Sequence, residues 1–192
     1  AGDVTFTGLK AIPTINVNAT NGDTVVQFAA GVNSGAADAA TVNLSSSAST
    51  GAVAVNVAGV ETLNVATAGA MSGTADSIVN GAVVAGTSVD LVTTTLTTLN
   101  VSGTAGARLT ATLQGATNTV TGTVTSAAGA DDIAVNADSG DKVNVAMGAG
   151  NDTVRIATIG TLTGSATVGG WTVSGGEGTD TLVMATGSSS IT

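Results

Sequence analysis

Short runs in which apolar and polar residues alternate recur along the whole chain. Each run is three to five residues long, as in 53–57 (Val-Ala-Val-Asn-Val), 63–65 (Leu-Asn-Val) and 143–145 (Val-Asn-Val). Alternation with a period of two predicts β-strands with one buried face. The stretches between runs consist mostly of Gly, Ser, Thr, Asn and Ala, which favour turns. The pattern therefore predicts an all-β fold built from many short strands.

Two of these runs are near copies of each other. Residues 60–65 read Val-Glu-Thr-Leu-Asn-Val and residues 96–101 read Leu-Thr-Thr-Leu-Asn-Val, each followed by a Gly-containing turn of small residues. Repetition of short strands predicts a parallel β-solenoid, in which apolar side chains of one coil stack on those of the next. The core must use small side chains, because the chain has two Phe, one Trp and no Tyr. A β-sandwich gives a similar pattern and stays open as the alternative fold.

Composition excludes several classes of function. Four Lys plus Arg against thirteen Asp plus Glu give a formal charge of -9, which argues against nucleic acid and anionic membrane surfaces as partners and in favour of cations. Without His or Cys, the chain has no thiol or imidazole catalysis and no zinc site built on those residues. No apolar run approaches the roughly 18 residues that span a bilayer. We expect a non-enzymatic protein that does not insert into a membrane.

Acidic residues are concentrated towards the end of the chain. Seven of the thirteen lie between Asp131 and Asp180. We therefore place a soft boundary between coils rich in Ala, Val and Thr (1–126) and an acidic segment (127–192), within what we expect to be one continuous unit. Neither end resembles a natural terminus, so we also expect a piece of a longer protein.

The acidic segment contains a recurrent nine-residue motif. Residues 175–183 (GGEGTDTLV) match the pattern Gly-Gly-x-Gly-x-Asp-x-U-x at every defined position, where U is a large apolar residue, and residues 147–155 (MGAGNDTVR) match all but the first Gly. The glycines permit a tight turn that directs carbonyl oxygens to a common point, and the Asp adds a carboxylate. Calcium takes about six to eight oxygen ligands, which loops on consecutive coils can supply jointly. The motif therefore predicts calcium ligands at Asp152 and Asp180.

Two weaker copies precede these motifs. Residues 129–133 keep Gly-x-Asp-x-U around Asp131, and residues 139–143 keep Asp-x-U around Asp141 with the Gly displaced by one. For both Asp131 and Asp141, a calcium ligand and a plain turn residue stand as equal alternatives.

The spacing of the acidic residues constrains which loops could share an ion. Asp131 and Asp152 are 21 residues apart, close to the about 18 residues that two nonapeptides span. With a small insertion, their two loops could share an ion. Asp152 and Asp180 are 28 residues apart. The larger spacing predicts an outward loop or an extra strand pair over 156–171.

The succession of segments 129–131, 147–154 and 175–183 resembles the repeats-in-toxin (RTX) class. In particular, it is similar to the calcium-binding crystalline surface-layer (S-layer) proteins that bacteria export by type I secretion. Segment 59–65 and the background rich in Ala, Thr, Val and Gly are similar to those proteins too. The match covers about the last third of the chain and lacks the uninterrupted nonapeptide array of RTX toxins, so a few isolated sites are expected.

The resemblance implies a right-handed β-solenoid that becomes an RTX-like β-roll towards the C-terminus. It implies export in an unfolded state, then calcium-triggered folding and self-assembly outside the cell, on the bacterial surface. It places the calcium ligands at Asp152 and Asp180 and at the carbonyls of Gly148, Gly150, Gly176 and Gly178. Two other functions stay open: an adhesin or carbohydrate-binding solenoid whose Thr and Asn ladders contact a glycan such as cell-surface polysaccharide, and a non-catalytic calcium module of a secreted enzyme.

Overall fold

The computed structural model describes most of the chain in segments separated by short gaps. The described ranges are 3–18, 24–45, 53–57, 59–68, 77–79, 82–84, 89–92, 95–117, 119–137, 141–156 and 170–184. Within these ranges the secondary structure is all β, without a helix. No helix long and apolar enough to cross a membrane occurs in them.

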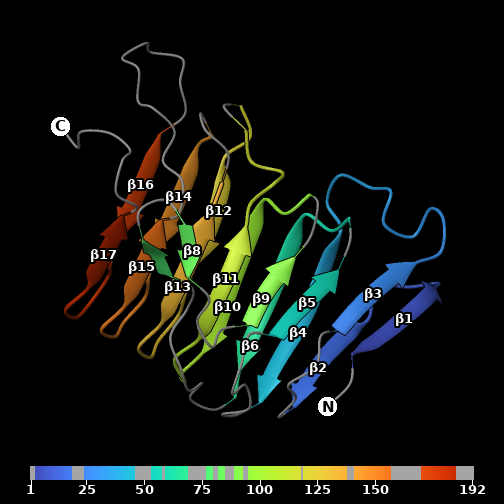
Figure 1. The fold of residues 1–192 in the computed structure, drawn as a ribbon, viewed down its shortest axis with the longest axis horizontal. Helices are drawn as coiled ribbons and strands as arrows, with labels where there is room; N and C mark the ends of the chain where they lie inside the picture. The colour runs from blue at the N-terminus through green and yellow to red at the C-terminus, as the bar shows by residue number, and fades with distance from the viewer. Residues whose placement is uncertain are drawn as a thin grey trace.

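Two parallel sheets contain all but two of the described strands (Figure 1). The eight-stranded sheet has the order β1 (Val4–Leu9), β3 (Thr24–Phe28), β5 (Val53–Val57), β9 (Val89–Val92), β11 (Arg108–Thr112), β13 (Asp132–Asn136), β15 (Thr153–Ile156), β17 (Thr181–Met184). The seven-stranded sheet has the order β2 (Thr14–Asn18), β4 (Ala39–Ser45), β6 (Thr62–Thr67), β10 (Thr98–Gly103), β12 (Gly122–Thr125), β14 (Val143–Ala146), β16 (Trp171–Ser174).

The chain alternates between the two sheets, which is the path of a β-solenoid. Each coil adds one strand to each sheet, and each strand pairs with its equivalent in the neighbouring coil. All these pairs are parallel. The predicted parallel β-solenoid is confirmed, and the β-sandwich is excluded because sandwich strands pair antiparallel.

The two near copies in the sequence lie on adjacent coils. Strand β6 pairs with β10 so that Leu63 lies opposite Leu99 and Asn64 opposite Asn100. The repeated apolar residues stack in the core, and the repeated Asn residues stack on the outer face. Segments 60–65 and 96–101 are thus similar because they occupy equivalent positions in two adjacent coils.

The core lies between the two sheets and is filled by Leu, Ile, Val and Ala. Its largest fully buried side chains are Leu and Ile, among them Leu63, Leu99 and Ile133. Each such side chain contributes about 1.5–3 kcal/mol on burial. Small side chains suffice because successive parallel strands lie only about 4.8 Å apart, so that each residue packs directly on its counterparts. A core of these side chains agrees with the small number of aromatic residues in the chain.

The coils continue without interruption past residue 127. Strand β12 pairs with both β10 and β14, and β11 pairs with β13. The change of composition near residue 127 is therefore not matched by a break in either sheet.

A hairpin inserted between β6 and β9 lies against the eight-stranded sheet. It consists of β7 (Ser77–Val79) and β8 (Ala82–Val84), which pair antiparallel. In Figure 1 the hairpin is drawn in front of β13 and β15, and β7 contacts β15. Beside it, the outward residues Thr110 on β11 and Ala134 on β13 are buried. The outer face of this sheet is therefore partly covered.

Candidate calcium site

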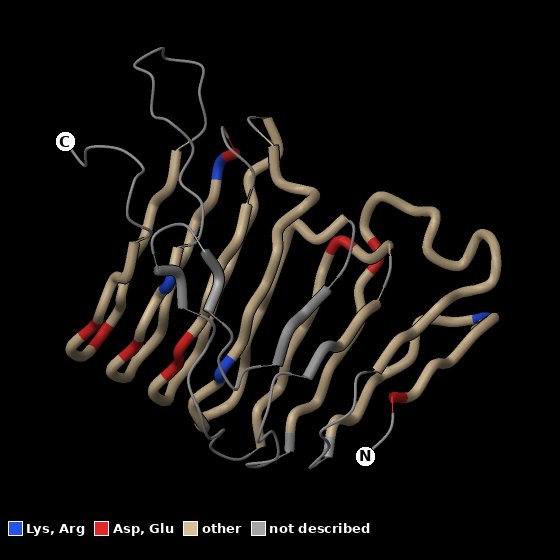
Figure 2. The backbone as a smooth tube through the Cα atoms, in the orientation of Figure 1, with Lys and Arg blue, Asp and Glu red and all other residues tan. Residues whose placement is uncertain are grey.

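Three loops stack on one another along one side of the solenoid. They connect the seven-stranded to the eight-stranded sheet at 126–131, 147–152 and 175–180. Backbone bridges join Ala128 to Ala149 and Ala149 to Glu177. Acidic residues mark these loops in the lower left of Figure 2. The two strong motif copies and the weaker copy at 129–133 therefore lie on consecutive coils.

The motif glycines allow these loops to approach each other closely. A Cβ atom on Gly148 would lie 1.4 Å from the carbonyl oxygen of Ala127, and one on Gly178 would lie 1.8 Å from that of Gly150. Gly178 also has a φ of 129°, in a region that L side chains rarely adopt. Stacking of the coils requires these glycines whether or not an ion is bound.

The motif Asp residues form a ladder along the solenoid. Asp180 Oδ1 accepts a hydrogen bond from the backbone N–H of Asp152 at 3.0 Å, and Asp152 Oδ1 accepts one from the N–H of Asp131 at 2.9 Å. Asp131 Oδ1 in turn accepts one from the N–H of Ala107 at 2.7 Å. One oxygen of each carboxylate therefore joins its coil to the preceding one.

The ladder carboxylates are unusual in their burial. Asp131 is 2% and Asp152 is 1% exposed, whereas Asp180, on the last described coil, is exposed. Burial raises the pKa of both Asp131 and Asp152 above the ordinary value of 3.8. Backbone hydrogen bonds oppose the rise, and the negative charge of the next Asp in the ladder adds to it. Both buried sites therefore favour a neutralising partner.

The second oxygen of Asp152 is the chemically unsatisfied atom of the ladder. Asp152 Oδ2 is buried and has no hydrogen-bond partner among the described residues. Leaving a buried polar atom unpaired costs about 1–3 kcal/mol, and more when the group is charged. Asp152 also lines, with Gly175 and Asp180, a cavity of about 170 Å³. A proton or a cation at Oδ2 would remove this cost.

The donor types in the stacked loops are those of a hard cation such as calcium. Carboxylate and carbonyl oxygens are its preferred ligands, and these loops offer no nitrogen or sulfur ligand from His or Cys. In the described ranges, however, no group of three or more acidic side chains could hold a metal. An ion would therefore depend largely on backbone carbonyls. The Gly148 carbonyl already accepts the N–H of Glu177 at 2.9 Å and retains one lone pair.

Asp141 does not belong to the ladder. It precedes β14 of the seven-stranded sheet, whereas the three ladder residues precede strands of the eight-stranded sheet. The chain enters the two sheets from opposite edges, so Asp141 lies across the solenoid from the stacked loops. Asp141 is buried and has an interaction partner. Of the four predicted acidic ligands, the structure thus brings together Asp131, Asp152 and Asp180. Most of the predicted outward segment 156–171 lies outside the described residues.

Two coil-to-coil contacts near the ladder are not predicted by the motif. Arg155 donates from Nε and Nη2 to the two carboxylate oxygens of Asp132, at 2.6 and 3.0 Å. Asn151 Oδ1 accepts the backbone N–H of Thr179 at 2.9 Å. Arg155 and Asp132 are opposite charges 23 residues apart, close to the 21-residue separation of Asp131 and Asp152, and this spacing was the available signal.

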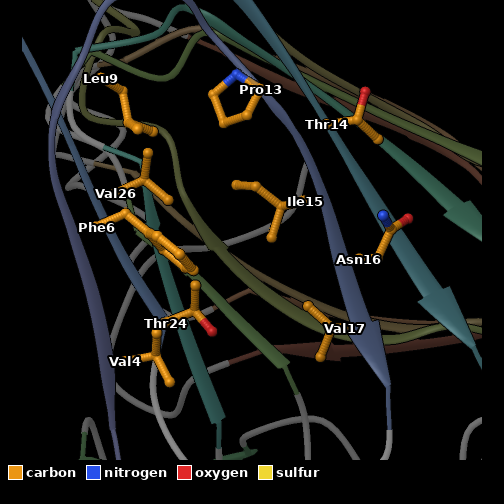
Figure 3. Close-up of a pocket in the computed structure, with 10 residues that line it drawn as sticks. All are labelled: Val4, Phe6, Leu9, Pro13, Thr14, Ile15, Asn16, Val17, Thr24 and Val26. Carbon is orange, nitrogen blue, oxygen red and sulfur yellow. The ribbon is translucent and has the colours of Figure 1, made fainter.

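A further cavity lies at the N-terminal end of the solenoid. It has a volume of about 560 Å³, and its lining includes Val4, Phe6, Ile15 and Val26 (Figure 3). None of the residues that line it is titratable. Val4 and Phe6 are 46% and 48% exposed on β1, the outermost described strand. The cavity is an open end of the core and carries no catalytic chemistry.

Comparison of the chain with family models, curated proteins and solved structures finds no match. The candidate site therefore rests on the motif and its geometry.

Proposed function

We propose that the chain is a structural, non-enzymatic segment of an extracellular bacterial S-layer protein whose stacked acidic loops bind Ca²⁺. The observation that carries the proposal is the buried, unpartnered Oδ2 of Asp152 within a ladder of three carboxylates. The match of both surrounding loops to the RTX nonapeptide supports calcium as the ion. In this proposal the chain is secreted by the type I route and assembles with copies of itself at the cell surface.

The residues of the ladder would use the ion to hold coil to coil. Asp152 and Asp180 lie on adjacent coils, and the charge of Asp180 raises the electrostatic cost of ionising Asp152. Bound Ca²⁺ supplies positive charge that offsets this repulsion and satisfies Asp152 Oδ2. The glycine carbonyls of 148, 150, 176 and 178 remain the predicted additional ligands. Because the ladder precedes β13, β15 and β17, stiffening is local to the C-terminal coils.

Calcium titration of the purified chain tests the proposal. Circular dichroism and thermal unfolding report folding, light scattering reports assembly, and EGTA and Mg²⁺ serve as controls. At a calcium concentration about 100-fold above Kd the folded state gains about 2.7 kcal/mol. For a chain of this size about 1 kcal/mol corresponds to roughly 2–4 °C, so Tm should rise by roughly 5–11 °C.

Two matched variants locate the ion. Asp152→Asn keeps the oxygen that accepts the Asp131 N–H but removes the carboxylate charge, so it should lose most of the calcium-dependent rise in Tm. Asp141→Asn makes the same chemical change across the solenoid and should keep the rise. An absence of any gain in structure, Tm or assembly up to millimolar calcium refutes the proposal. An equal gain in Asp152→Asn and the parent shows that the ladder does not hold the ion.

A further inference from the structure

The outer face of the seven-stranded sheet carries no charge at its described positions. Two columns of its outward residues cross most of the strands, defined by register as Thr14, Thr41, Asn64, Asn100, Thr125, Ala146, Ser174 and as Ala39, Thr62, Thr98, Thr123, Asn144, Thr172. We call these two columns the Asn/Thr face. All these residues are exposed or half-buried. The outer face of the other sheet differs, since it carries Arg108, Asp132 and Arg155 and is partly covered by the β7–β8 hairpin.

Absence of charge over such a wide face is informative in this chain. The chain has a formal charge of -9, yet the charged residues nearest these strands stand just before them: Asp38 before β4, Glu61 before β6, and Asp141 and Lys142 before β14. Charge therefore borders the Asn/Thr face without entering it. A partner that binds there meets neither attraction nor repulsion from ionised groups, which favours a neutral partner.

Side chains along this sheet hold one another in place. Asn100 donates from Nδ2 to Asn64 Oδ1 at 3.0 Å, and Asn100 Oδ1 accepts from Thr125 Oγ1 at 3.0 Å. Beside the first column, Asn43 donates to Asn16 Oδ1 at 2.8 Å. These bonds fix the side chains at intervals of about 4.8 Å across the strands. Pre-organised groups lose less conformational entropy on binding than mobile ones.

The residue types exclude most macromolecular partners. Without Lys or Arg, the Asn/Thr face cannot neutralise the phosphates of a nucleic acid. It also lacks the aromatic, Met and Arg side chains that concentrate binding energy in protein interfaces. Asn amides and Thr hydroxyls both donate and accept hydrogen bonds. Such groups match the hydroxyls of an uncharged carbohydrate.

We propose that the Asn/Thr face binds a neutral, extended polysaccharide that lies along the solenoid axis, across the strands of the seven-stranded sheet. Each sugar would make weak contacts with one or two coils, and the contacts add up along the chain of the polymer because they are linked. The face should therefore retain a polymer far better than a short oligosaccharide. This activity is separate from the calcium ladder, which lies on the loops at one edge of the sheets.

Co-sedimentation with insoluble neutral polysaccharides tests the proposal. The full chain is mixed with microcrystalline cellulose, insoluble β-1,3-glucan or chitin, and the fraction retained is measured with calcium and with EGTA. The test variant Thr41→Lys with Asn144→Lys places two charges on the Asn/Thr face, at residues without a side-chain hydrogen bond to another described residue. The control variant Thr5→Lys with Gln27→Lys adds the same charge at exposed positions of the eight-stranded sheet. Circular dichroism confirms that each variant is folded.

The proposal expects retention of the parent on at least one of the three polymers, in EGTA as well as in calcium. The affinity should fall at least tenfold in the Thr41/Asn144 variant and should stay within twofold in the Thr5/Gln27 variant. Retention on none of the three polymers overturns the proposal, as does an equal loss in both variants. Retention that appears only with calcium assigns the binding to the acidic loops or to an assembly and also overturns it. A negative calcium titration leaves this test unaffected.

Discussion

Stacking of the motif loops predicts that one methyl group at Gly148 will separate two coils. The Cβ of Ala at this position would lie 1.4 Å from the carbonyl oxygen of Ala127, whereas ordinary contact begins at 3.4 Å. The loops must therefore move apart by about 2 Å. Two hydrogen bonds join the two loops at this contact: Ala149 N–H donates to Ala127 O at 2.8 Å, and Gly129 N–H donates to Ala149 O at 2.9 Å.

The cost of Gly148→Ala follows from those two bonds. Each intramolecular hydrogen bond contributes about 0.5–1.5 kcal/mol, and forcing extra volume into a packed contact costs about 1–3 kcal/mol. We expect a loss of about 3 kcal/mol or more in the free energy of unfolding. Urea unfolding followed by circular dichroism measures it, in EGTA so that calcium makes no contribution. Amide hydrogen exchange should show the loss of protection at Ala149 and Gly129.

Two other Gly→Ala changes separate the steric effect from backbone strain. Gly8 has a φ of 67° with open space around it, so Ala there should cost only the left-handed penalty of about 1–2 kcal/mol. Gly170 has open space and no positive φ, and Ala there should change stability by about 0.5 kcal/mol or less. If Gly148→Ala unfolds at the same urea concentration as Gly170→Ala, the close stacking of the loops is refuted.

Two further predictions concern the ladder and the core. In EGTA, the free energy of unfolding should rise as pH falls from about 7 towards 3.8. Burial raises the pKa of Asp131 and Asp152 in the folded state above 3.8, the value taken for the unfolded chain. The folded state therefore binds protons more tightly, and stability is lost as pH rises through the folded-state pKa. Asp152→Asn should flatten this dependence of the urea midpoint, and an unchanged slope would contradict the assignment. Leu99→Ala should cost about 2–5 kcal/mol because Leu99 is fully buried. Val120→Ala, at a residue 46% exposed, should cost far less, and equal costs would show that Leu99 is not a core residue.

The alternation of apolar and polar residues and the internal repetition predicted the fold, because each strand's own sequence shows which of its residues are buried. Alternation places Leu63 and Val65 inside and Asn64 outside. The same sequence, Leu-Asn-Val, recurs at 99–101 and indicates that the two strands are neighbours. Parallel stacking makes such copies lie in register, so the repeat alone could identify one coil position. The β7–β8 hairpin was not predicted, because its short apolar runs resemble those of the coil strands and only its antiparallel pairing distinguishes it.

The nonapeptide spacing predicted which loops come together but not what every acidic residue does there. Asp131, Asp152 and Asp180 follow from the motif because position six precedes a strand of the same sheet in each copy. Asp141 keeps only the short pattern Asp-x-U, which can also precede a strand of the other sheet, as it does before β14. Which sheet a strand joins depends on how many strands precede it, so a local motif does not contain that information.

Some parts of the motif are explained by stacking of the coils, and one part is not. The glycines are required by coil contacts, since even Gly106, outside any motif copy, would place a Cβ 2.1 Å from Ala130 O. One oxygen of each ladder Asp is explained by its bond to a backbone N–H. An Asn could make that bond without the cost of a buried charge. The second oxygen of Asp152 therefore carries the case for calcium, because a chain that needed only stacked loops would gain nothing by keeping a carboxylate there.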